Sequence, residues 1–374
     1  MKSFKSGKYI NQGNYSSFQP EYINRKWELN NMELITLLGQ ADRELGRLDM
    51  YSEYIPNIDL FISMHIAKEA TKSSKIEGTK TNIEDALLEK EDVKEEKRDD
   101  WQEVRNYITA LNTAIDKLEE LPFSSRLIKA THKVLLDDVR GKHKLPGEFR
   151  TSQNWIGGAS ISDAIFIPPN YSSINDYMSD IEKFMHNEEY YFPDILKIAF
   201  IHYQFETIHP FLDGNGRVGR LMITLYLVEK KILKRPTLYL SDFFERNRTL
   251  YYDNLMRVRE KDDITQWFKF FLVGVIETAK NSIITFDSIL KLQKDLENKI
   301  QKLGNRSHNA LSVINYLYQR PMIDAAVMKK VTDLSMPSVY KLIGELEKLE
   351  ILKEITGSKK GKLYIFEEYL KLFR

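Results

Sequence analysis

The stretch that decides the fold is His209-Pro210-Phe211-Leu212-Asp213-Gly214-Asn215-Gly216-Arg217-Val218-Gly219-Arg220. An apolar run over residues 195–205 precedes it, and a second apolar run over 221–228 follows it. Both runs have the composition of helices, so the sequence predicts two helices joined by a loop. One histidine, one carboxylate, three glycines and two arginines lie within these twelve residues, so the chemistry of the chain is concentrated in the loop.

The loop has the composition of an anion-binding site. Gly214 and Gly216 let the backbone turn tightly, so that main-chain N–H groups can point at a ligand. The helix that begins near Gly216 adds unpaired N–H groups and the positive end of its dipole, which favours a phosphate. Arg217 and Arg220 are three residues apart and therefore project from the same first turn, and their guanidinium groups fit phosphate oxygens.

Two further side chains give the loop its reactive groups. Asp213 is its one carboxylate, and beside phosphates a single carboxylate suits Mg²⁺, which usually takes one or two carboxylates with phosphate oxygens and water. His209 is the one group in the loop that accepts a proton near neutral pH. The loop therefore predicts a phosphate site with a base beside it.

Two simpler interpretations of the loop are weaker. Gly214, Gly216 and Gly219 match the G-x-G-x-x-G fingerprint of dinucleotide-binding proteins, but that fingerprint follows a strand, whereas residues 197–205 predict a helix. A helix–loop–helix corner with solvated arginines and a capping histidine would account for each residue alone. It does not account for the whole set.

The twelve residues resemble the signature of the Fic-domain family, His-Pro-Phe-x-Asp/Glu-Gly-Asn-Gly-Arg-x-x-Arg, at every fixed position. The resemblance implies Mg²⁺-dependent transfer of a nucleoside monophosphate, usually AMP from ATP, to a Ser, Thr or Tyr hydroxyl of a protein. The enzyme itself is one candidate target. By matching position, His209 is the base that deprotonates the target hydroxyl, and Asp213 holds Mg²⁺ between the α- and β-phosphates.

The same resemblance assigns the remaining loop residues to the nucleotide and to the core. Asn215 contacts the α-phosphate, and the Gly214 and Gly216 amides contact the β-phosphate. Arg217 and Arg220 hold the outer phosphates, and Phe211 anchors the loop. In similar sequences a tyrosine at the position of Tyr252 lies against the adenine, although an aromatic residue on a helix more often belongs to the core.

The segment Ser73-Ser74-Lys75-Ile76-Glu77-Gly78, at the end of a predicted helix, has two interpretations. Gly78 can be the glycine that stops a helix, with Glu77 an ordinary surface charge, although an acidic residue there opposes the helix dipole. The segment also resembles the inhibitory Ser/Thr-x-x-x-Glu-Gly/Asn motif of Fic proteins. We adopt this second interpretation, which implies that Glu77 pairs with Arg220 and denies it to the γ-phosphate.

Residues 147–169 change character and predict two short strands, at about 152–156 and 164–167, around a Gly/Ser turn. A packing hairpin is one interpretation. In Fic proteins a hairpin here resembles the flap that pairs its main chain with the target protein. On this resemblance the flap comprises Trp155, Ile156, Gly157, Gly158 and Phe166.

Length and composition limit the class of protein. The 374 residues predict two or three domains, and 42% hydrophobic residues suffice for sizeable cores. A net charge of +1 argues against attraction of the whole protein to nucleic acid or membrane. The absence of cysteine, of an apolar leader and of any long apolar run favours a cytoplasmic protein without a membrane segment.

Hydrophobic spacing predicts a mainly α fold with a small β-hairpin flap. We expect a polar extended arm over 1–28, a solvated charge run over 89–100, and a polar connector that ends near residue 305. We divide the chain into an N-terminal helical region (1–100), a Fic-type core (101–292) and a C-terminal domain (304–374). Helices are expected at about 30–48, 58–75, 101–118, 125–139, 173–186, 192–208, 216–231, 247–258 and 264–290.

The C-terminal residues resemble a winged helix-turn-helix domain, with helices at 311–318, 324–331 and 337–349 and strands at 351–355 and 363–366. Residues 304–374 contain 12 Lys/Arg against 8 Asp/Glu, but the expected recognition helix carries Glu345 and Glu347, which repel phosphates. DNA binding, protein contact and homodimerisation all stay open. Two other functions also stay open: a nucleotide-sensing transcriptional regulator, and an enzyme that removes AMP by using Glu77 to align water.

Overall fold

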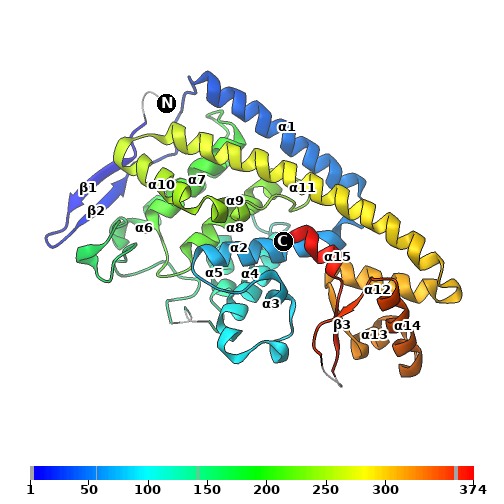
Figure 1. The fold of residues 1–374 in the computed structure, drawn as a ribbon. Helices are drawn as coiled ribbons and strands as arrows, with labels where there is room; N and C mark the ends of the chain where they lie inside the picture. The colour runs from blue at the N-terminus through cyan, green and yellow to red at the C-terminus, as the bar shows by residue number, and fades with distance from the viewer. Residues whose placement is uncertain (1–3, 56, 140, 142, 358–360) are drawn as a thin grey trace.

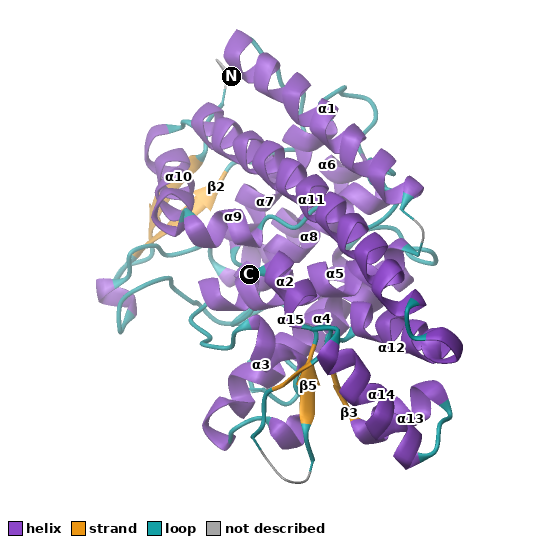
Figure 2. Ribbon diagram, turned by 45° about the vertical axis from the view of Figure 1, so that its right-hand side comes forward, coloured by secondary structure: helices purple, strands orange, loops and turns teal. Residues whose placement is uncertain are grey.

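The computed structural model describes residues 4–55, 57–139, 141, 143–357 and 361–374, and it is mainly helical. Two long helices, α1 (Met32–Tyr54) and α11 (Ile264–Gln301), lie side by side along one edge of the molecule (Figures 1 and 2). Asn31 caps α1 by accepting from the Leu34 N–H, and Asp263 caps α11 by accepting from the Gln266 N–H. The mainly α fold predicted from the sequence is confirmed.

The signature loop lies at the centre, between α7 (Asp194–Ile208) and α8 (Asn215–Glu229). Every residue of α7 after its first is buried, because this mainly apolar helix is enclosed by its neighbours, which also cover its few polar side chains. The surrounding helices are α2 (Ile58–Ile76), α4 (Arg98–Lys117), α5 (Ser125–Leu135), α6 (Ile174–His186), α9 (Ser241–Arg246) and α10 (Arg248–Lys261). Short α3 (Ile83–Leu87) and α9 were not predicted.

The expected polar connector was partly wrong, because α11 continues to Gln301. Leu292, Leu296 and Ile300 continue its buried stripe at a spacing of four residues, within an otherwise polar sequence. Helix α12 (Ser307–Gln319) packs against this last part of α11. The charge run over 89–100 is mostly exposed, as predicted, and forms two 3₁₀ turns (Lys90–Asp92 and Glu95–Lys97) before α4 begins.

The N-terminal segment is a hairpin rather than the extended arm that we expected. Strands β1 (Gly7–Asn11) and β2 (Ser16–Pro20) pair antiparallel, with Gly7 opposite Pro20. The Phe18 N–H donates to the Ile167 carbonyl at 2.8 Å, and the Phe18 ring packs beside Phe166 at 5.8 Å. No local pattern predicted the hairpin, because the segment that anchors it is distant in the sequence. In Figure 1 the hairpin lies beside the expected flap.

The expected flap is less regular than predicted. In place of two strands it has one isolated bridge, Ile156 to Phe166, and a 3₁₀ turn at its tip (Ile161–Asp163). The Asp163 carboxylate accepts from the Ala159 and Ser160 N–H groups and so closes the tip locally. These side-chain bonds replace the longer ladder that we expected.

The C-terminal elements follow the predicted order. Helices α12, α13 (Ala325–Thr332) and α14 (Met336–Lys348) are present, as are strands β4 (Lys353–Glu354) and β5 (Leu363–Ile365). Strand β3 (Met322–Asp324) and helix α15 (Glu367–Leu370) were missed, and the sheet order is β3-β5-β4. Residues 358–360 of the expected wing lie outside the described residues.

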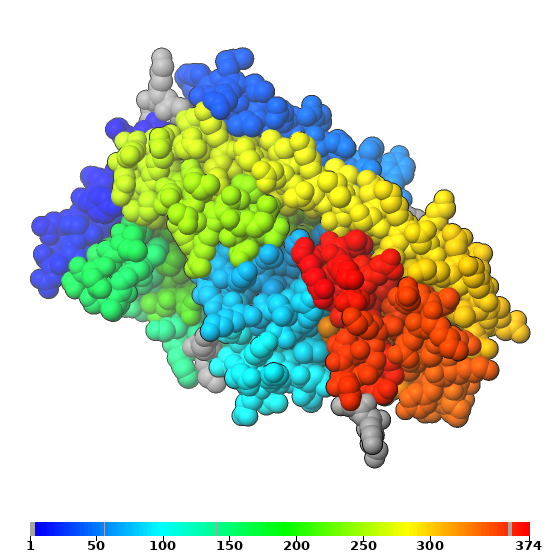
Figure 3. Space-filling view, in the orientation of Figure 1, coloured from blue at the N-terminus to red at the C-terminus, as the bar shows by residue number. Residues whose placement is uncertain are grey.

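The C-terminal elements pack on the N-terminal helices. The Tyr318 ring on α12 contacts Phe61 of α2 at 5.0 Å, and the Phe373 ring contacts His65 of α2 at 5.0 Å. Figure 3 shows this last segment lying against the N-terminal helices and α11. Within the described residues, every helix is too short or too polar to span a lipid bilayer.

Candidate active site

A sharp turn at His209 separates the two central helices. His209 adopts left-handed backbone angles (φ 50°, ψ 61°), which are uncommon for a side chain other than glycine, and it ends α7. Arg150 holds the turn, since its Nε donates to the His209 carbonyl at 3.0 Å and its own N–H donates to the Pro210 carbonyl at 2.8 Å. Arg150 is buried and was not among the predicted site residues.

Asn215 closes the loop from inside. Its Oδ1 accepts from the Phe211 N–H at 2.8 Å, and its Nδ2 donates to the Phe211 carbonyl at 2.9 Å. Both ends of the carboxamide therefore contact Phe211, a structural role that the sequence did not reveal. Its expected contact with an α-phosphate stays a prediction.

His132 forms the floor beneath the loop. Its ring stacks on Phe211 with centroids 3.7 Å apart, as expected for a phenylalanine that anchors the loop. The Gly147 N–H donates to its Nδ1, so its Nε2 carries the proton and donates to the Asp213 carbonyl at 3.0 Å. Burial lowers the pKa of His132 to about 4, which keeps the ring neutral.

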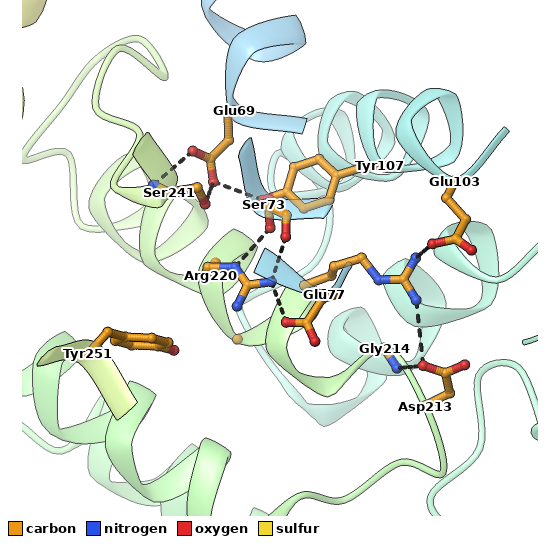
Figure 4. A network of polar contacts seen from close by, with 12 residues as sticks. Glu69, Ser73, Glu77, Glu103, Tyr107, Asp213, Gly214, Arg220, Ser241 and Tyr251 are labelled. Atoms are coloured by element: carbon orange, nitrogen blue, oxygen red, sulfur yellow. Dashed lines mark hydrogen bonds and ion pairs between the residues drawn. The ribbon is translucent and has the colours of Figure 1, made fainter. Parts of the chain in front are cut away.

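Asp213 and Arg217 lie at the open end of α8. Asp213 Oδ1 accepts from the Gly214 N–H at 2.6 Å and lies 3.6 Å from the Arg217 guanidinium. Arg217 also binds Glu103 of α4 at 3.0 Å (Figure 4). The Gly214 N–H, expected at a β-phosphate, is thus occupied in this structure. Glu103 was missed, because no local pattern links α4 to the loop.

Arg220 is bound by the end of α2, as the inhibitory motif implied. Its guanidinium donates to Glu77 Oε1 at 2.6 Å, to Ser73 Oγ at 2.9 Å and to the Ser73 carbonyl at 2.9 Å. Desolvation favours the neutral form of Glu77, but Arg220 outweighs it and holds the pKa of Glu77 below its ordinary value. Gly78, with φ 105°, follows the end of the helix. The two interpretations of this segment are therefore compatible, since Gly78 ends the helix and Glu77 contacts Arg220.

Gly216 makes the contact between Glu77 and Arg220 possible. A Cβ at Gly216 would lie 2.2 Å from Glu77 Oε1, so a larger residue would displace the carboxylate. About two turns before Glu77 on α2, the Glu69 carboxylate accepts from Tyr107 at 3.0 Å and from Ser241 Oγ at 2.5 Å (Figure 4). Glu69 is 3% exposed, so these bonds fix α2 against α4 and α9. Glu69 was not among the predicted site residues.

A cleft of about 600 Å³ joins the loop, Glu77 and the expected flap. The residues that line it come from α2, the flap, α7, α8 and α10: Glu77, Trp155, Ile156, Gly157, Ile165, Phe166, Glu206, His209, Gly216, Arg220, Arg248, Tyr251, Tyr252, Leu255, Met256 and Arg259. Tyr252 and four of the five flap residues are thus brought to His209. Gly158 is instead at the flap tip, close against Asp163.

His209 is in the protonation state that a base needs. Its Nδ1 is buried and has no hydrogen-bond partner among the described residues. Desolvation lowers the pKa of His209 to about 4, and the charges of Arg150 and Arg259 act in the same direction, while Glu77 opposes them. The imidazole is therefore neutral at physiological pH and can accept a proton inside the cleft.

Comparison with known protein families identifies the chain. The model of the Fic/DOC family N-terminal region matches residues 35–116, and the model of the Fic/DOC family matches residues 122–227, which include the signature loop. The protein is a member of the Fic/DOC family. The resemblance drawn from twelve residues is confirmed.

Curated relatives of this Fic/DOC protein match part of its length. The "Protein adenylyltransferase Fic" of Aedes aegypti is 30% identical over 125 residues, which are 33% of this chain and 22% of the mosquito protein. A "Probable protein adenylyltransferase" of Aquifex aeolicus is 29% identical over 157 residues, 40% of this chain and 44% of that protein. The matches therefore span less than half the length of these relatives.

Solved structures support the fold. A Fic family protein from Desulfovibrio desulfuricans superposes with a TM-score of 0.58 at 18% identity, covering 91% of this chain and 98% of the other. A Fic domain containing signaling protein from Bacteroides thetaiotaomicron gives a TM-score of 0.53 at 17% identity, covering 66% and 95%. At these identities the likeness concerns the fold alone.

Proposed function

We propose that this Fic/DOC protein transfers AMP from ATP to a Ser, Thr or Tyr hydroxyl of a target protein, and that Glu77 restrains the reaction. The observation that carries the proposal is the neutral His209, which shares one cleft with Arg220 and the first turn of α8. The names of the curated relatives, protein adenylyltransferases, agree with it. Target and substrate are proposals for this chain.

In the proposed step the target hydroxyl oxygen attacks the α-phosphorus of ATP. A new P–O bond forms there, and the bond from the α-phosphorus to the bridging oxygen of the β-phosphate breaks. Pyrophosphate leaves with that electron pair, and the hydroxyl proton passes to His209. A base with a pKa near 4 holds the proton only briefly, so His209 serves to remove it as the P–O bond forms.

The loop residues suit the charged half of ATP. Arg217 and Arg220 project from the first turn of α8, where free N–H groups and the helix dipole favour phosphate. Asp213, with its side chain 43% exposed, offers the single carboxylate that suits Mg²⁺ beside phosphates. A bound Mg²⁺ would neutralise phosphate charge. Within the described residues, no group of three or more potential ligands forms a site of its own.

The pair between Glu77 and Arg220 supplies the restraint. Arg220 is 2% exposed and already binds Glu77 and Ser73, so a γ-phosphate has to displace Glu77 before it gains the guanidinium. The flap supplies the docking edge, because Trp155 and Ile165 are exposed on either side of the Ile156 bridge. A target segment added there would bring its hydroxyl to the cleft that contains His209.

The test uses purified wild type, Glu77→Gly and His209→Ala with α-labelled ATP, Mg²⁺ and cell lysate. We expect label on protein bands, the enzyme's own included, that rises with Glu77→Gly and vanishes with His209→Ala. Glu91→Gly, which removes an exposed glutamate of the charge run, is the matched control and should behave as wild type. No label with any variant would reject AMP transfer. Loss of label from modified protein, dependent on Glu77, would indicate AMP removal instead.

A further inference from the structure

Glu206 is a buried carboxyl group with no role in the mechanism proposed above. It lies on α7, three residues before His209, is 7% exposed and forms part of the cleft wall. Its Oε1 has no hydrogen-bond partner among the described residues. Burial raises the pKa of Glu206 to about 7, which reflects the same lack of partners.

The two nearby guanidinium groups are bound elsewhere. Arg259 donates to the Thr207 hydroxyl and the Glu206 carbonyl, and it stacks over the Phe166 ring at 3.9 Å. Arg220 is bound to Ser73 and Glu77. Neither forms a hydrogen bond to the Glu206 carboxyl group, although both charges act on it. A buried carboxyl without a partner destabilises the fold, so an apolar side chain would serve packing better.

The first turn of α8 has room for this carboxyl group. A Cβ at Gly219 would lie 2.3 Å from Glu206 Oε1, just as a Cβ at Gly216 would lie 2.2 Å from Glu77 Oε1. Each glycine therefore admits one carboxylate beside the anion-binding turn. Glu77 has a partner in Arg220, whereas Glu206 Oε1 has no hydrogen-bond partner in the described part of the chain.

The cleft indicates which kind of group that is. A carboxylate repels phosphates, which Arg217 and Arg220 attract, so Glu206 suits the uncharged half of a nucleotide. Tyr252, Leu255 and Met256 line the same cleft and offer the aromatic and apolar surface on which a nucleoside packs. Adenosine has two kinds of hydrogen-bond donor, its ribose hydroxyls and the exocyclic amine of its base.

We propose that Glu206 is a specificity-determining residue that accepts a hydrogen bond from the nucleoside half of the nucleotide, from a ribose hydroxyl or from the exocyclic amine. The inference rests on the proposed nucleotide function. In the proposed function the other polar groups of the cleft bind the phosphates or accept the proton. Glu206 adds a polar contact that selects the nucleoside.

The test measures nucleotide binding by calorimetry on the full chain in the Glu77→Gly background, with and without Glu206→Gln. Glutamine keeps the size of the side chain and removes its charge. The ligands are ATP, 2′-deoxy-ATP, 3′-deoxy-ATP and inosine triphosphate, each analogue lacking one donor. Glu260→Gln, on the exposed side of α10, is the matched control.

We expect Glu206→Gln to weaken ATP binding about 10- to 100-fold at pH 8, above the pKa of about 7 at which Glu206 ionises, because this is the range for a hydrogen bond to a charged group. The analogue that lacks the contacted donor should bind the parent chain about as weakly as ATP binds Glu206→Gln, and Glu206→Gln should not change its affinity. The identity of that analogue shows which donor Glu206 contacts. ATP binding that is equal in both chains, or an equal loss for every ligand, would overturn the inference. Failure of every nucleotide to bind the parent chain would overturn the proposed function with it.

Folding is checked separately by thermal unfolding without nucleotide. Because Glu206 Oε1 has no hydrogen-bond partner that the structure describes, Glu206→Gln should not lower the Tm. If Glu206→Gln does not fold, Glu206→Asp replaces it, since aspartate keeps the charge but withdraws it by one methylene. Glu206→Asp should then show the same selective loss, and uniform binding of all ligands would refute the contact.

Discussion

Replacing Glu77 with glycine should destabilise the free protein and strengthen ATP binding by similar factors. The contact that is lost is one charge-assisted hydrogen bond of 2.6 Å to a guanidinium whose side chain is 1% exposed. Hydrogen bonds to charged groups contribute about 1.5–3 kcal/mol. Because the Glu77 side chain is 34% exposed and partly screened by solvent, we expect the lower part of that range, about 1–2 kcal/mol.

The two effects have opposite signs because Glu77 stabilises Arg220 in the free protein but competes with the γ-phosphate for the same guanidinium. Without ATP, Arg220 keeps its bonds to Ser73 but loses its counter-charge, so the free energy of unfolding falls by about 1–2 kcal/mol. With ATP, the γ-phosphate no longer has to displace a carboxylate, so affinity rises roughly 5- to 30-fold. Glu77→Gln, which keeps an acceptor but no charge, should fall between wild type and Glu77→Gly in both measurements.

The assay is thermal unfolding of the three chains with and without ATP and Mg²⁺, together with ATP affinity by calorimetry. Glu77→Gly should have the lowest Tm without nucleotide and the largest rise in Tm with it. Unchanged Tm and unchanged affinity would refute the reasoning that the contact between Glu77 and Arg220 competes with the γ-phosphate. A fall in Tm without a gain in ATP affinity would show that the contact between Glu77 and Arg220 stabilises the fold but does not compete with ATP.

Three further outcomes follow from the structure. At saturating ATP, where protonation of Glu206 (pKa about 7) no longer limits nucleotide binding, the turnover of Glu77→Gly should show no protonation step of His209 near pH 6.5 and should fall only near pH 4 or below. The pKa of His209 is lowered to about 4, and loss of Glu77 lowers it further; a pH–rate profile checks this. Glu69→Ala should lower the free energy of unfolding by about 2–4 kcal/mol, since it leaves three buried donors (the Tyr107 hydroxyl and the Ser241 hydroxyl and N–H) without their acceptor, as urea denaturation would measure. Phe373→Ala should destabilise the chain by about 3–5 kcal/mol, because its ring is 2% exposed against α2, and a transition that splits in two instead would mean that the C-terminal elements unfold alone.

The parts of the site that the sequence could predict are those set by local geometry. Gly214, Gly216 and the two arginines lie within one loop and one helical turn, so their spacing alone places them around an anion. The contacts that hold the loop come from distant segments. The bonded residues are separated in sequence by 114, 81 and 59 positions for Glu103, His132 and Arg150 respectively. No periodicity in the sequence links these three residues to the loop.

Glu206 had a signal that was overlooked. It is a charged residue near the end of a mainly apolar helix in which every side chain after the first is buried. A buried charge requires a partner or a function. The Phe18 anchor of the N-terminal hairpin gave no comparable signal, because a single phenylalanine in a polar segment says nothing of the segment on which it packs.

The position of Glu77 on α2 limits how its restraint can be released. Of the 19 residues of α2, 13 are buried, and the helix contacts α4, α9 and α12. Withdrawing the whole helix would expose Phe61, Met64 and Ala70 to water, at a cost of several kcal/mol in hydrophobic burial alone. A γ-phosphate offers only the binding energy of one guanidinium in exchange. The Glu77 side chain, one-third exposed beyond the last turn of α2, can instead rotate away without moving the helix. Release by a change at Glu77 alone is therefore the less costly route, and the core of the protein stays as it is.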